Sequence, residues 1–329
     1  MIVTSDFAPA KYMSNPHLQS AWPTLLMRKK PSVKTKRERI DLPDSDFMDL
    51  EWHDSGLDES APIVILLHGI TGNVNAPYIK YMMPILAKQG WRSVMMYYRG
   101  YSGEHNRANV MTHAGKTDDF AELVKLLHER EPETIISAVG FSQGGNMLLK
   151  YLGEVKGDTA LRCAVAISPP FQLRSISNRI RRGMPQFYQW YLLRQLREFY
   201  RRKFRYRPAT FALNRLSELT SFWQFDDNVT APVHGFRNAV DYYRQASCER
   251  FLPSIEIPTL IIHAKDDPIM TPDIIPTENK ISKSTTLELS QHGGHLGFVS
   301  GTWRHPIFWL NQRVPEFLKE QMEFSTANE

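Results

Sequence analysis

A serine between two glycines is the first feature of the sequence that could do chemistry. The run Gly140-Phe141-Ser142-Gln143-Gly144 matches G-x-S-x-G, in which the serine occupies a sharp turn between a strand and a helix. Such short matches also occur by chance, so the flanking sequence decides. A β-rich apolar run at 135–139 precedes the match, and apolar residues at helical spacing follow it. This context favours a nucleophilic serine at the positive end of a helix dipole.

A nucleophilic serine requires a histidine base and an acid that orients the base. Asp266 and Asp267 follow an apolar strand and precede a proline, although a pair of this kind also fits an ordinary turn. The spacing favours Asp267 as the acid, with Asp266 as the alternative. His295 lies in a glycine-rich loop after the last expected strand, and His292 is its competitor. The order serine, aspartate, histidine, each after a strand, is far more specific than the serine motif alone.

Two backbone N–H groups are the expected donors to an oxyanion. One would come from Ile70, just after His68 and Gly69, and the other from Gln143, next to the serine. Because these donors are backbone groups, the side chains of Ile70 and Gln143 are free to vary. His68 is expected to support its loop structurally. The histidines show no spacing with acids or cysteines that is typical of a metal site, so neither a metal nor a cofactor is expected.

The elements that must position these residues alternate along the chain. Apolar strands are expected at 63–67, 93–98, 135–139, 164–168, 259–264 and 286–289. Helices are expected at 76–89, 117–128, 143–155, 272–281 and 306–322. Continuous apolar strands between helices predict an α/β fold with a mostly parallel central sheet flanked by helices. The segment 37–52 predicts an antiparallel hairpin that leads into this sheet.

The interval 171–252 breaks the alternation. It contains no strand-like run, only helical sequence rich in aromatic residues and arginine. An insertion at the carboxyl ends of two parallel strands would cover the place where open α/β sheets bind ligands. We therefore expect a core domain of residues 1–170 and 253–329 and a helical cap of residues 171–252.

The net charge of +5 is unevenly distributed along the chain. Basic residues cluster at 28–39 and, more densely, at 174–207 within the expected cap. A solvated helix face is the favoured explanation, because no nucleic-acid-binding motif accompanies the charge. Phe187, Trp190 and Tyr191 interleave with the second cluster, which suggests a weaker hypothesis of contact with an anionic membrane surface.

The composition is that of an ordinary globular protein, with 42% hydrophobic and 23% charged residues among 329. No apolar run approaches the length of a membrane-spanning helix, and the N-terminal sequence lacks the pattern of a secretory signal. Cys163 and Cys248 are too few for a disulfide framework. A reducing, cytoplasmic location is expected.

Several short motifs together carry a family resemblance. The chain resembles the AB hydrolase superfamily, specifically the AB hydrolase 4 family of YheT-like esterases, over nearly its whole length. The motifs are Asn15-Pro16-His17-Leu18-Gln19, His68-Gly69, Arg99-Gly100-Tyr101-Ser102-Gly103, Ala114-Gly115-Lys116-Thr117-Asp118-Asp119, the run from Gly140 to Gly145, Phe225-Asp226-Asp227, Asp241-Tyr242-Tyr243-Arg244, Asp266-Asp267-Pro268 and Gly293-Gly294-His295.

The resemblance implies an α/β-hydrolase fold with a helical cap, and hydrolysis of carboxylic esters by a Ser-Asp-His triad. Related eukaryotic members act on lipid esters or transfer acyl groups to alcohols. Gln143 departs from the leucine or methionine common after the nucleophile, which leaves the amide donor unchanged and alters the side chain at the pocket mouth.

Residues and resemblance together predict a serine hydrolase that cleaves short- to medium-chain or lipid-like carboxylic esters through an acyl-enzyme. A small-molecule ester is the expected partner, and nucleic acid is not. An acyltransferase that passes the acyl group to an alcohol is the second hypothesis. A non-catalytic hydrolase fold that binds ligands is the third, and the complete set of triad residues disfavours it.

Overall fold

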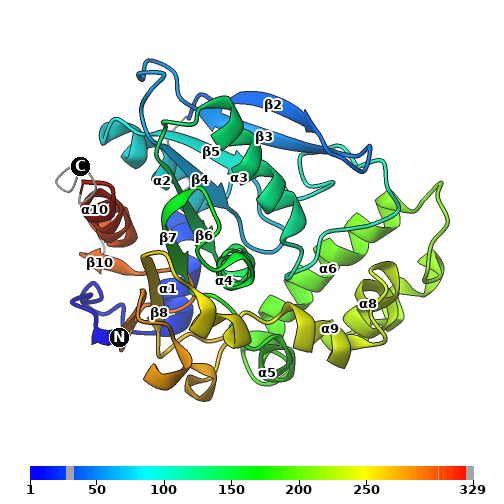
Figure 1. Ribbon diagram of the computed structural model, residues 1–329. Helices are drawn as coiled ribbons and strands as arrows, with labels where there is room; N and C mark the ends of the chain where they lie inside the picture. Colours follow the sequence, from blue (N-terminus) through cyan, green and yellow to red (C-terminus); the bar gives the residue numbers. More distant parts are fainter. Residues whose placement is uncertain (27–32, 303, 324–329) are drawn as a thin grey trace.

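The computed structural model describes residues 1–26, 33–302 and 304–323 of the chain, and a nine-stranded sheet forms its centre (Figure 1). The strands lie in the order β1 (Ile2–Thr4), β9 (Thr285–Ser290), β8 (Thr259–Ala264), β7 (Leu161–Ile167), β6 (Ile136–Phe141), β4 (Ile63–Leu67), β5 (Arg92–Met96), β3 (Phe47–His53) and β2 (Lys36–Asp41). All neighbours from β1 to β5 are parallel, whereas β3 and β2 are antiparallel to their neighbours. The predicted mostly parallel sheet is confirmed.

The central strands are buried along their whole length. Every side chain of β4, β5, β6 and β8 is buried, as expected for strands covered on both faces. All six predicted strands are present, and those at 63–67 and 259–264 have the predicted bounds. Continuous apolar sequence therefore predicted the part of the sheet that carries the site.

Helices cover both faces of the sheet. They are α2 (Pro77–Lys88), α3 (Asp118–Arg130), α4 (Gln143–Val155) and α10 (Leu310–Glu323). Side chains of α3 and α4, including Leu123 and Leu148, belong to the hydrophobic core on one face. Side chains of α2 and α10, including Met82 and Leu318, belong to the core on the other face. Figure 1 shows α10 and α3 on opposite sides of the strands.

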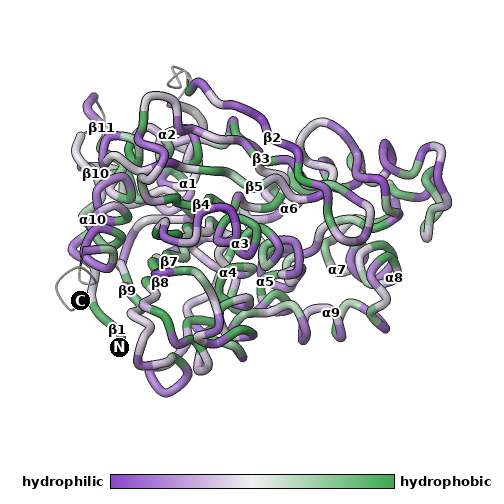
Figure 2. The backbone as a smooth tube through the Cα atoms, turned by 45° about the horizontal axis from the view of Figure 1, so that its top comes forward, coloured by the Kyte–Doolittle hydropathy of each residue, from purple (hydrophilic) through white to green (hydrophobic). Residues whose placement is uncertain are grey.

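The predicted hairpin is present as β2 and β3, which pair from Lys36 with Trp52 to Asp41 with Phe47. Figure 2 shows β2 in hydrophilic colours, in keeping with its place at the edge of the sheet. The basic cluster expected at 28–39 overlaps this strand, and its residues 28–32 lie outside the described residues. Within the described part, Arg37 pairs with Glu51 at 3.1 Å and Arg39 with Asp49 at 2.7 Å.

Two predicted helices differ from the structure. Residues 272–281 form two short 3₁₀ turns, η4 (Pro272–Ile274) and η5 (Glu278–Lys280), so the helix predicted there is wrong. Between the turns Ile275 is extended, with ψ at 124°, because the proline that follows disfavours helical geometry at the residue before it.

The helix predicted at 306–322 begins later than expected, at Leu310. Its first residues instead form β11 (Pro306–Phe308), which pairs antiparallel with β10 (Val299–Gly301). Helix α1 (Pro16–Leu26) and the edge strand β1 were not predicted from the sequence. Strands of three residues are too short to show a hydrophobic period.

Between β7 and β8, where the structure describes every residue, the chain forms helices joined by turns and loops, and no strand. The elements are α5 (Leu173–Arg179), α6 (Pro185–Lys203), η1 (Leu213–Glu218), α7 (Phe222–Phe225), the π-helical turn η2 (Asp226–Thr230), α8 (Ala231–Val233), α9 (Ala239–Ala246) and η3 (Glu249–Ser254). Leu193, Tyr200, Phe204 and Leu216 lie in a separate hydrophobic core within this insertion. In Figure 1 helices α6, α8 and α9 lie on the side of the molecule away from both chain ends.

Candidate active site

Ser142 lies on the turn that joins β6 to α4. Its backbone dihedrals are φ 51° and ψ −115°, a region that residues other than glycine seldom occupy. A Cβ atom at Gly140 would lie 2.5 Å from the carbonyl oxygen of Gly144. One at Gly144 would lie 2.3 Å from the carbonyl oxygen of Leu67. Glycine is therefore required on both sides of the serine, because backbone segments approach too closely for a side chain.

His295 connects Ser142 to Asp267 through two short contacts. Its Nε2 lies 2.9 Å from Oγ of Ser142, and its Nδ1 lies 2.7 Å from Oδ2 of Asp267. Asp267 is buried, and Ser142 is 9% exposed. A carboxylate beside Nδ1 favours the tautomer with its proton on Nδ1, which leaves Nε2 to accept the serine proton. The three residues expected to act together are thus within hydrogen-bonding distance.

The neighbouring carboxylate, Asp266, contacts other groups. Its Oδ2 lies 3.2 Å from Nδ1 of His292, and its Oδ1 accepts a 2.9 Å hydrogen bond from the N–H of Gly294. Burial raises the pKa of Asp266. Of the two acids that the sequence left open, the structure brings Asp267 to His295 and places Asp266 with the competing histidine.

Helix α1 supports the loop that carries His295. The N–H of His295 donates a 2.8 Å hydrogen bond to Oγ of Ser20. A Cβ atom at Gly294 would lie 2.4 Å from the carbonyl oxygen of Pro16, and one at Gly297 would lie 2.3 Å from that of Gln19. The glycines of the loop therefore allow its backbone to lie directly against the helix.

Ile70 and Gln143, the expected sources of the two oxyanion donors, line the same cavity as Ser142. Gln143 is the first residue of α4, so the N-terminal end of that helix lies next to the serine. Unpaired N–H groups and the helix dipole make such an end favourable for negative charge.

The loop before Ile70 is held in place by buried hydrogen bonds. Nδ1 of His68 lies 2.7 Å from the carbonyl oxygen of Gly69, and the hydroxyl of Tyr98 donates a 2.7 Å hydrogen bond to the carbonyl of His68. Burial lowers the pKa of His68 to about 4, so its ring is neutral at pH 7. The N–H of Gly69 donates to the hydroxyl of Tyr78 at 2.9 Å. These contacts agree with a structural role for His68.

A cavity with an empty volume of about 950 Å³, its mouth included, opens beside Ser142. The sheet side contributes Ile70, Tyr98 and Met270, and the helical insertion contributes Ile176, Leu196 and Phe225 among others. Most lining side chains are apolar. An apolar lining with a few polar groups is typical of sites for small organic ligands.

Three residues around this site were not found by sequence reasoning. Nothing in the sequence marks Tyr78, whose hydroxyl accepts a hydrogen bond from the N–H of Gly69. Ser20 directly follows the motif that ends at Gln19, and that proximity is its only signal. Asp226 lines the cavity and stands in the motif Phe225-Asp226-Asp227, whose sequence alone indicates no role.

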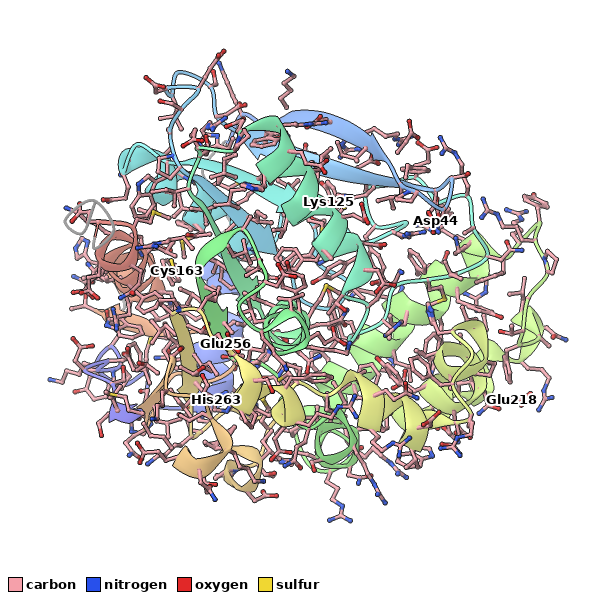
Figure 3. The ribbon with its side chains drawn as sticks, in the orientation of Figure 1. Asp44, Lys125, Cys163, Glu218, Glu256 and His263 are labelled. Atoms are coloured by element: carbon pink, nitrogen blue, oxygen red, sulfur yellow. The ribbon has the colours of Figure 1, made fainter. Side chains whose placement is uncertain are left out.

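Both cysteines are free and buried, and Figure 3 shows Cys163 within the sheet region. Among the described residues, no helix is long and apolar enough to cross a membrane. In the same part of the chain, no three or more His, Cys, Asp or Glu side chains are grouped so that they could hold a metal ion.

Comparisons with known proteins agree with this architecture. The family model described as alpha/beta hydrolase fold matches residues 62–302. The chain is 38% identical to the protein named "Putative esterase YheT" of Escherichia coli (strain K12), covering 97% of this chain and 95% of that protein. It is 28% identical to "Phospholipase ABHD3" of Mus musculus, covering 98% of this chain and 80% of that protein.

Among solved structures, an esterase of Pyrococcus furiosus, Pf2001, is similar with a TM-score of 0.56 and 20% identity, covering 88% of this chain and 92% of that one. At this identity the likeness concerns the fold. The extent of the family match and the similarity over nearly the full length to the Escherichia coli protein give the same assignment: the chain belongs to the alpha/beta hydrolase fold family, as a YheT-like member.

Proposed function

We propose that this protein hydrolyses carboxylic esters, with Ser142 as nucleophile, His295 as base and Asp267 as the acid that orients the base. One observation carries the proposal: a continuous chain of contacts from Asp267 through His295 to Ser142 ends at a largely apolar cavity. The family relationship supports a hydrolase, because similar proteins are named esterases, phospholipases and monoacylglycerol lipases.

In the proposed acylation step, Nε2 of His295 removes the proton of Ser142 while the serine oxygen attacks the ester carbonyl carbon. The carbonyl oxygen gains negative charge and accepts hydrogen bonds from the N–H groups of Ile70 and Gln143. The tetrahedral intermediate then collapses, and the imidazolium of His295 gives its proton to the departing alcohol. An acyl group remains on Ser142.

Deacylation repeats these steps with water. His295 takes a proton from a water molecule, which attacks the acyl carbon, and the carboxylic acid leaves as Ser142 recovers its proton. Asp267 stabilises the imidazolium in both steps and keeps Nε2 directed at the serine. The proposed chemistry uses only side chains and backbone groups of this chain.

The helical insertion is proposed to act as a cap over this chemistry, with residues 171–252 as its extent. Ile176, Leu196 and Phe225 of the insertion line the cavity that also contains Ser142. Esters with an apolar acyl or alcohol part are the proposed substrates, because burial of such groups against these side chains is favourable.

Replacing the nucleophile tests the proposal. We expect Ser142→Ala to lower kcat/KM for p-nitrophenyl acetate and butyrate by at least about three orders of magnitude, since members of a triad act as a unit. A fluorophosphonate probe should label the parent and not Ser142→Ala. Ser175→Ala serves as the matched control, because its hydroxyl hydrogen-bonds Gln172 on the insertion. Equal turnover by Ser142→Ala and the parent would refute the proposal.

Transfer of the acyl group to an alcohol shares the same acyl-enzyme. Whether water or an alcohol attacks is measured by product analysis in mixtures of ethanol and water. Hydrolysis predicts the free acid as the main product, whereas an acyltransferase gives mostly the ethyl ester. A non-catalytic ligand-binding fold would neither turn over esters nor react with the fluorophosphonate.

A further inference from the structure

The cavity wall formed by the insertion contains a carboxylate that the proposed catalysis does not use. Asp226 lines the cavity and begins the π-helical turn η2. Such turns are rare and are frequently found at functional sites. Phe225, Tyr242 and Tyr243 line the same part of the insertion, so the carboxylate stands among aromatic rings.

Neutral hydroxyl groups surround the carboxylate. The hydroxyl of Thr230 donates to Oδ1 of Asp226 at 2.7 Å, and the hydroxyl of Tyr243 donates to Oδ2 at 2.7 Å. The Tyr243 hydroxyl also lies 3.1 Å from Oγ of Ser177. No ion pair involving Asp226 is found among residues 1–26, 33–302 and 304–323. A carboxylate accepts about four hydrogen bonds, so acceptor capacity is left over.

Asp226 borders the cavity, where a ligand can reach it. Its carboxylate is largely removed from water, although the residue as a whole keeps some exposed area. Surrounding protein raises the pKa of Asp226 to about 6, and the charge of Asp227 adds to this effect. A carboxylate in an apolar cavity wall has a high desolvation cost unless hydrogen-bond partners compensate for it.

We propose that Asp226, Thr230 and Tyr243 form a polar subsite that binds a hydroxyl group of the ester substrate. This inference rests on the proposed function and narrows its substrate class to esters that carry a hydroxyl on the alcohol or acyl part. A hydroxyl can donate to Asp226, whose carboxylate keeps acceptor sites beyond those that Thr230 and Tyr243 occupy.

The cost of burying a charge favours a hydroxyl over an ammonium group at this subsite. His113 lines the same cavity, and burial, His234 and the ammonium groups of Lys116 and Lys150 hold the pKa of His113 well below its ordinary value. The cavity thus keeps an imidazole on its wall neutral. A neutral donor at Asp226 likewise avoids the desolvation cost of burying a charge.

Pairs of esters test the subsite. The two members of each pair have similar shapes and differ in whether they carry the polar group. The first pair is glycerol monobutyrate and the butyrate ester in which a methyl group replaces each hydroxyl. The second pair is the methyl esters of ω-hydroxydecanoic and undecanoic acid. For the parent we expect kcat/KM to favour the hydroxyl ester of at least one pair by about tenfold. Dimethylaminoethyl butyrate and isoamyl butyrate form a third pair, for which no preference for the cation is expected.

The variants assign this preference to Asp226. Asp226→Leu should bring the hydroxyl-to-methyl ratio close to one, and Asp226→Asn, which keeps the side-chain shape, should reduce it in the same direction. Glu218→Gln is the matched control with an unchanged ratio, because Glu218 of the insertion pairs with Arg215 at 2.8 Å and does not line the cavity. A ratio of rates is not moved by a general loss of folded protein.

Failure of the two proposals can be told apart. A parent enzyme that cleaves none of the esters contradicts the proposed function. Cleavage without a hydroxyl preference, or with a preference that both Asp226 variants retain, overturns the polar subsite alone. A preference for the ammonium ester that depends on Asp226 also overturns it, because the bound group would then be a cation.

A second inference concerns the outer surface of α6. Met184, just before the helix, and Phe187, Trp190 and Tyr191 within it are 67%, 63%, 54% and 53% exposed. Their spacing of three and four residues places them on one side of the helix. Leu192 and Leu196 of the same helix line the cavity. One helix therefore borders the cavity and exposes an apolar strip.

Basic residues accompany this strip. Arg181 and Arg182 are exposed just before the helix, and the guanidinium of Arg194 lies 5.9 Å from the ring centre of Trp190. We propose that this face, from Met184 to Arg194, docks on an anionic lipid surface. Tryptophan and tyrosine suit the boundary between headgroups and acyl chains, and arginine complements the negative headgroups.

Vesicle co-sedimentation tests the docking face. We expect the parent to bind vesicles of phosphatidylcholine and phosphatidylglycerol at low salt and to release them at high salt, where charge is screened. The double variant Phe187→Ser/Trp190→Ser should bind about tenfold more weakly. Tyr12→Ser/Tyr206→Ser is the matched control, since both tyrosines are exposed elsewhere. Equal binding by both double variants, or no binding by the parent, would overturn the inference.

Discussion

Asp266 and Asp267 are adjacent in sequence, yet their carboxylates contact different histidines. The 2.7 Å contact of Asp267 with His295 leads to the serine, whereas Asp266 binds His292 and the N–H of Gly294. A substitution at either position removes one negative charge from the same turn. Any difference in activity between the two variants therefore reports on position and not on overall charge.

We expect Asp267→Asn to lower kcat by about three to four orders of magnitude, because an amide at this position favours the wrong imidazole tautomer. Asp266→Asn should lower kcat by less than about tenfold, since its carboxylate supports the loop without touching His295. Steady-state kinetics with p-nitrophenyl butyrate compare the two. Equal losses would mean that the acids share the role.

At this scale the sequence predicts some residues and leaves others open. Ser142 and His295 stand in glycine-rich motifs. The glycines indicate close backbone packing around each residue, and this restricts the roles that Ser142 and His295 can have. The choice between Asp266 and Asp267 depends on which way each side chain leaves the turn, and spacing alone does not determine that direction. Tyr78 acts through a hydroxyl that meets the backbone of Gly69, a contact made only by folding.

The turn between β6 and α4 requires glycine at positions 140 and 144, because backbone atoms leave no space there for a side chain. We expect Gly144→Ala to lower the free energy of unfolding by about 3 kcal/mol, because the added methyl group meets the backbone of Leu67. Urea denaturation measures the change. Gly157→Ala is the control, since the nearest atom to its Cβ belongs to the flexible carboxylate of Glu256, labelled in Figure 3. Equal stability of the two variants would contradict the argument.

Several motifs that mark the family position elements and lie away from the reacting atoms. Arg99 donates from Nε to Asp119 at 2.9 Å and from Nη1 to Asp46 at 3.1 Å, which joins the hairpin to α3. Asn146 of α4 donates 2.8 Å hydrogen bonds to the carbonyls of Ala114 and Ala246, which ties the insertion to the core. The chemical types of these residues alone did not reveal such roles.

Elements were predictable where the hydrophobic pattern was long. The central strands were found because burial on both faces requires unbroken apolar sequence. Helix α4 was found because its apolar residues recur at helical spacing. Residues 272–281 carry apolar residues at helical spacing, but Pro276 interrupts the helix. The short strand β1 pairs with β9, far along the chain, so local sequence could not predict it. Strands β10 and β11 pair with each other, but three residues are too few to show a hydrophobic period.

Across the whole molecule, buried neutral histidines link stability to pH. Burial is the main cause that lowers the pKa of His68, His234 and His263 to about 4 in each case. His263, labelled in Figure 3, is a residue of β8, and the charge of Asp267 partly opposes the pKa shift of its ring. An unfolded chain takes up a proton at each histidine near pH 6.5, well before the folded protein does.

Stability should therefore fall as the pH decreases from about 6.5 to 4, because the unfolded state binds more protons in this window. Each ring contributes about 2 kcal/mol between pH 7 and 5. Asp226 acts in the opposite sense, since its pKa is raised to about 6 and protonation there favours the folded state. His113, whose pKa is also lowered, adds to the effect of the three histidines, and Asp266, whose pKa is raised, adds to that of Asp226. Histidines outnumber these carboxylates, so we expect the net effect of acid on the folded protein to be a loss of stability.

Urea denaturation at pH 7 and pH 5 measures this linkage. We expect the parent to lose about 2 kcal/mol more than His263→Leu over the same interval, because the variant lacks one buried imidazole that must stay neutral. His305→Leu, at an exposed position, controls for the loss of a histidine as such. The comparison uses a difference between two pH values, so the cost of repacking around position 263 cancels to first order. If His263→Leu and the parent lose the same stability, the ring at 263 is protonated equally in both states, and its burial does not couple folding to pH.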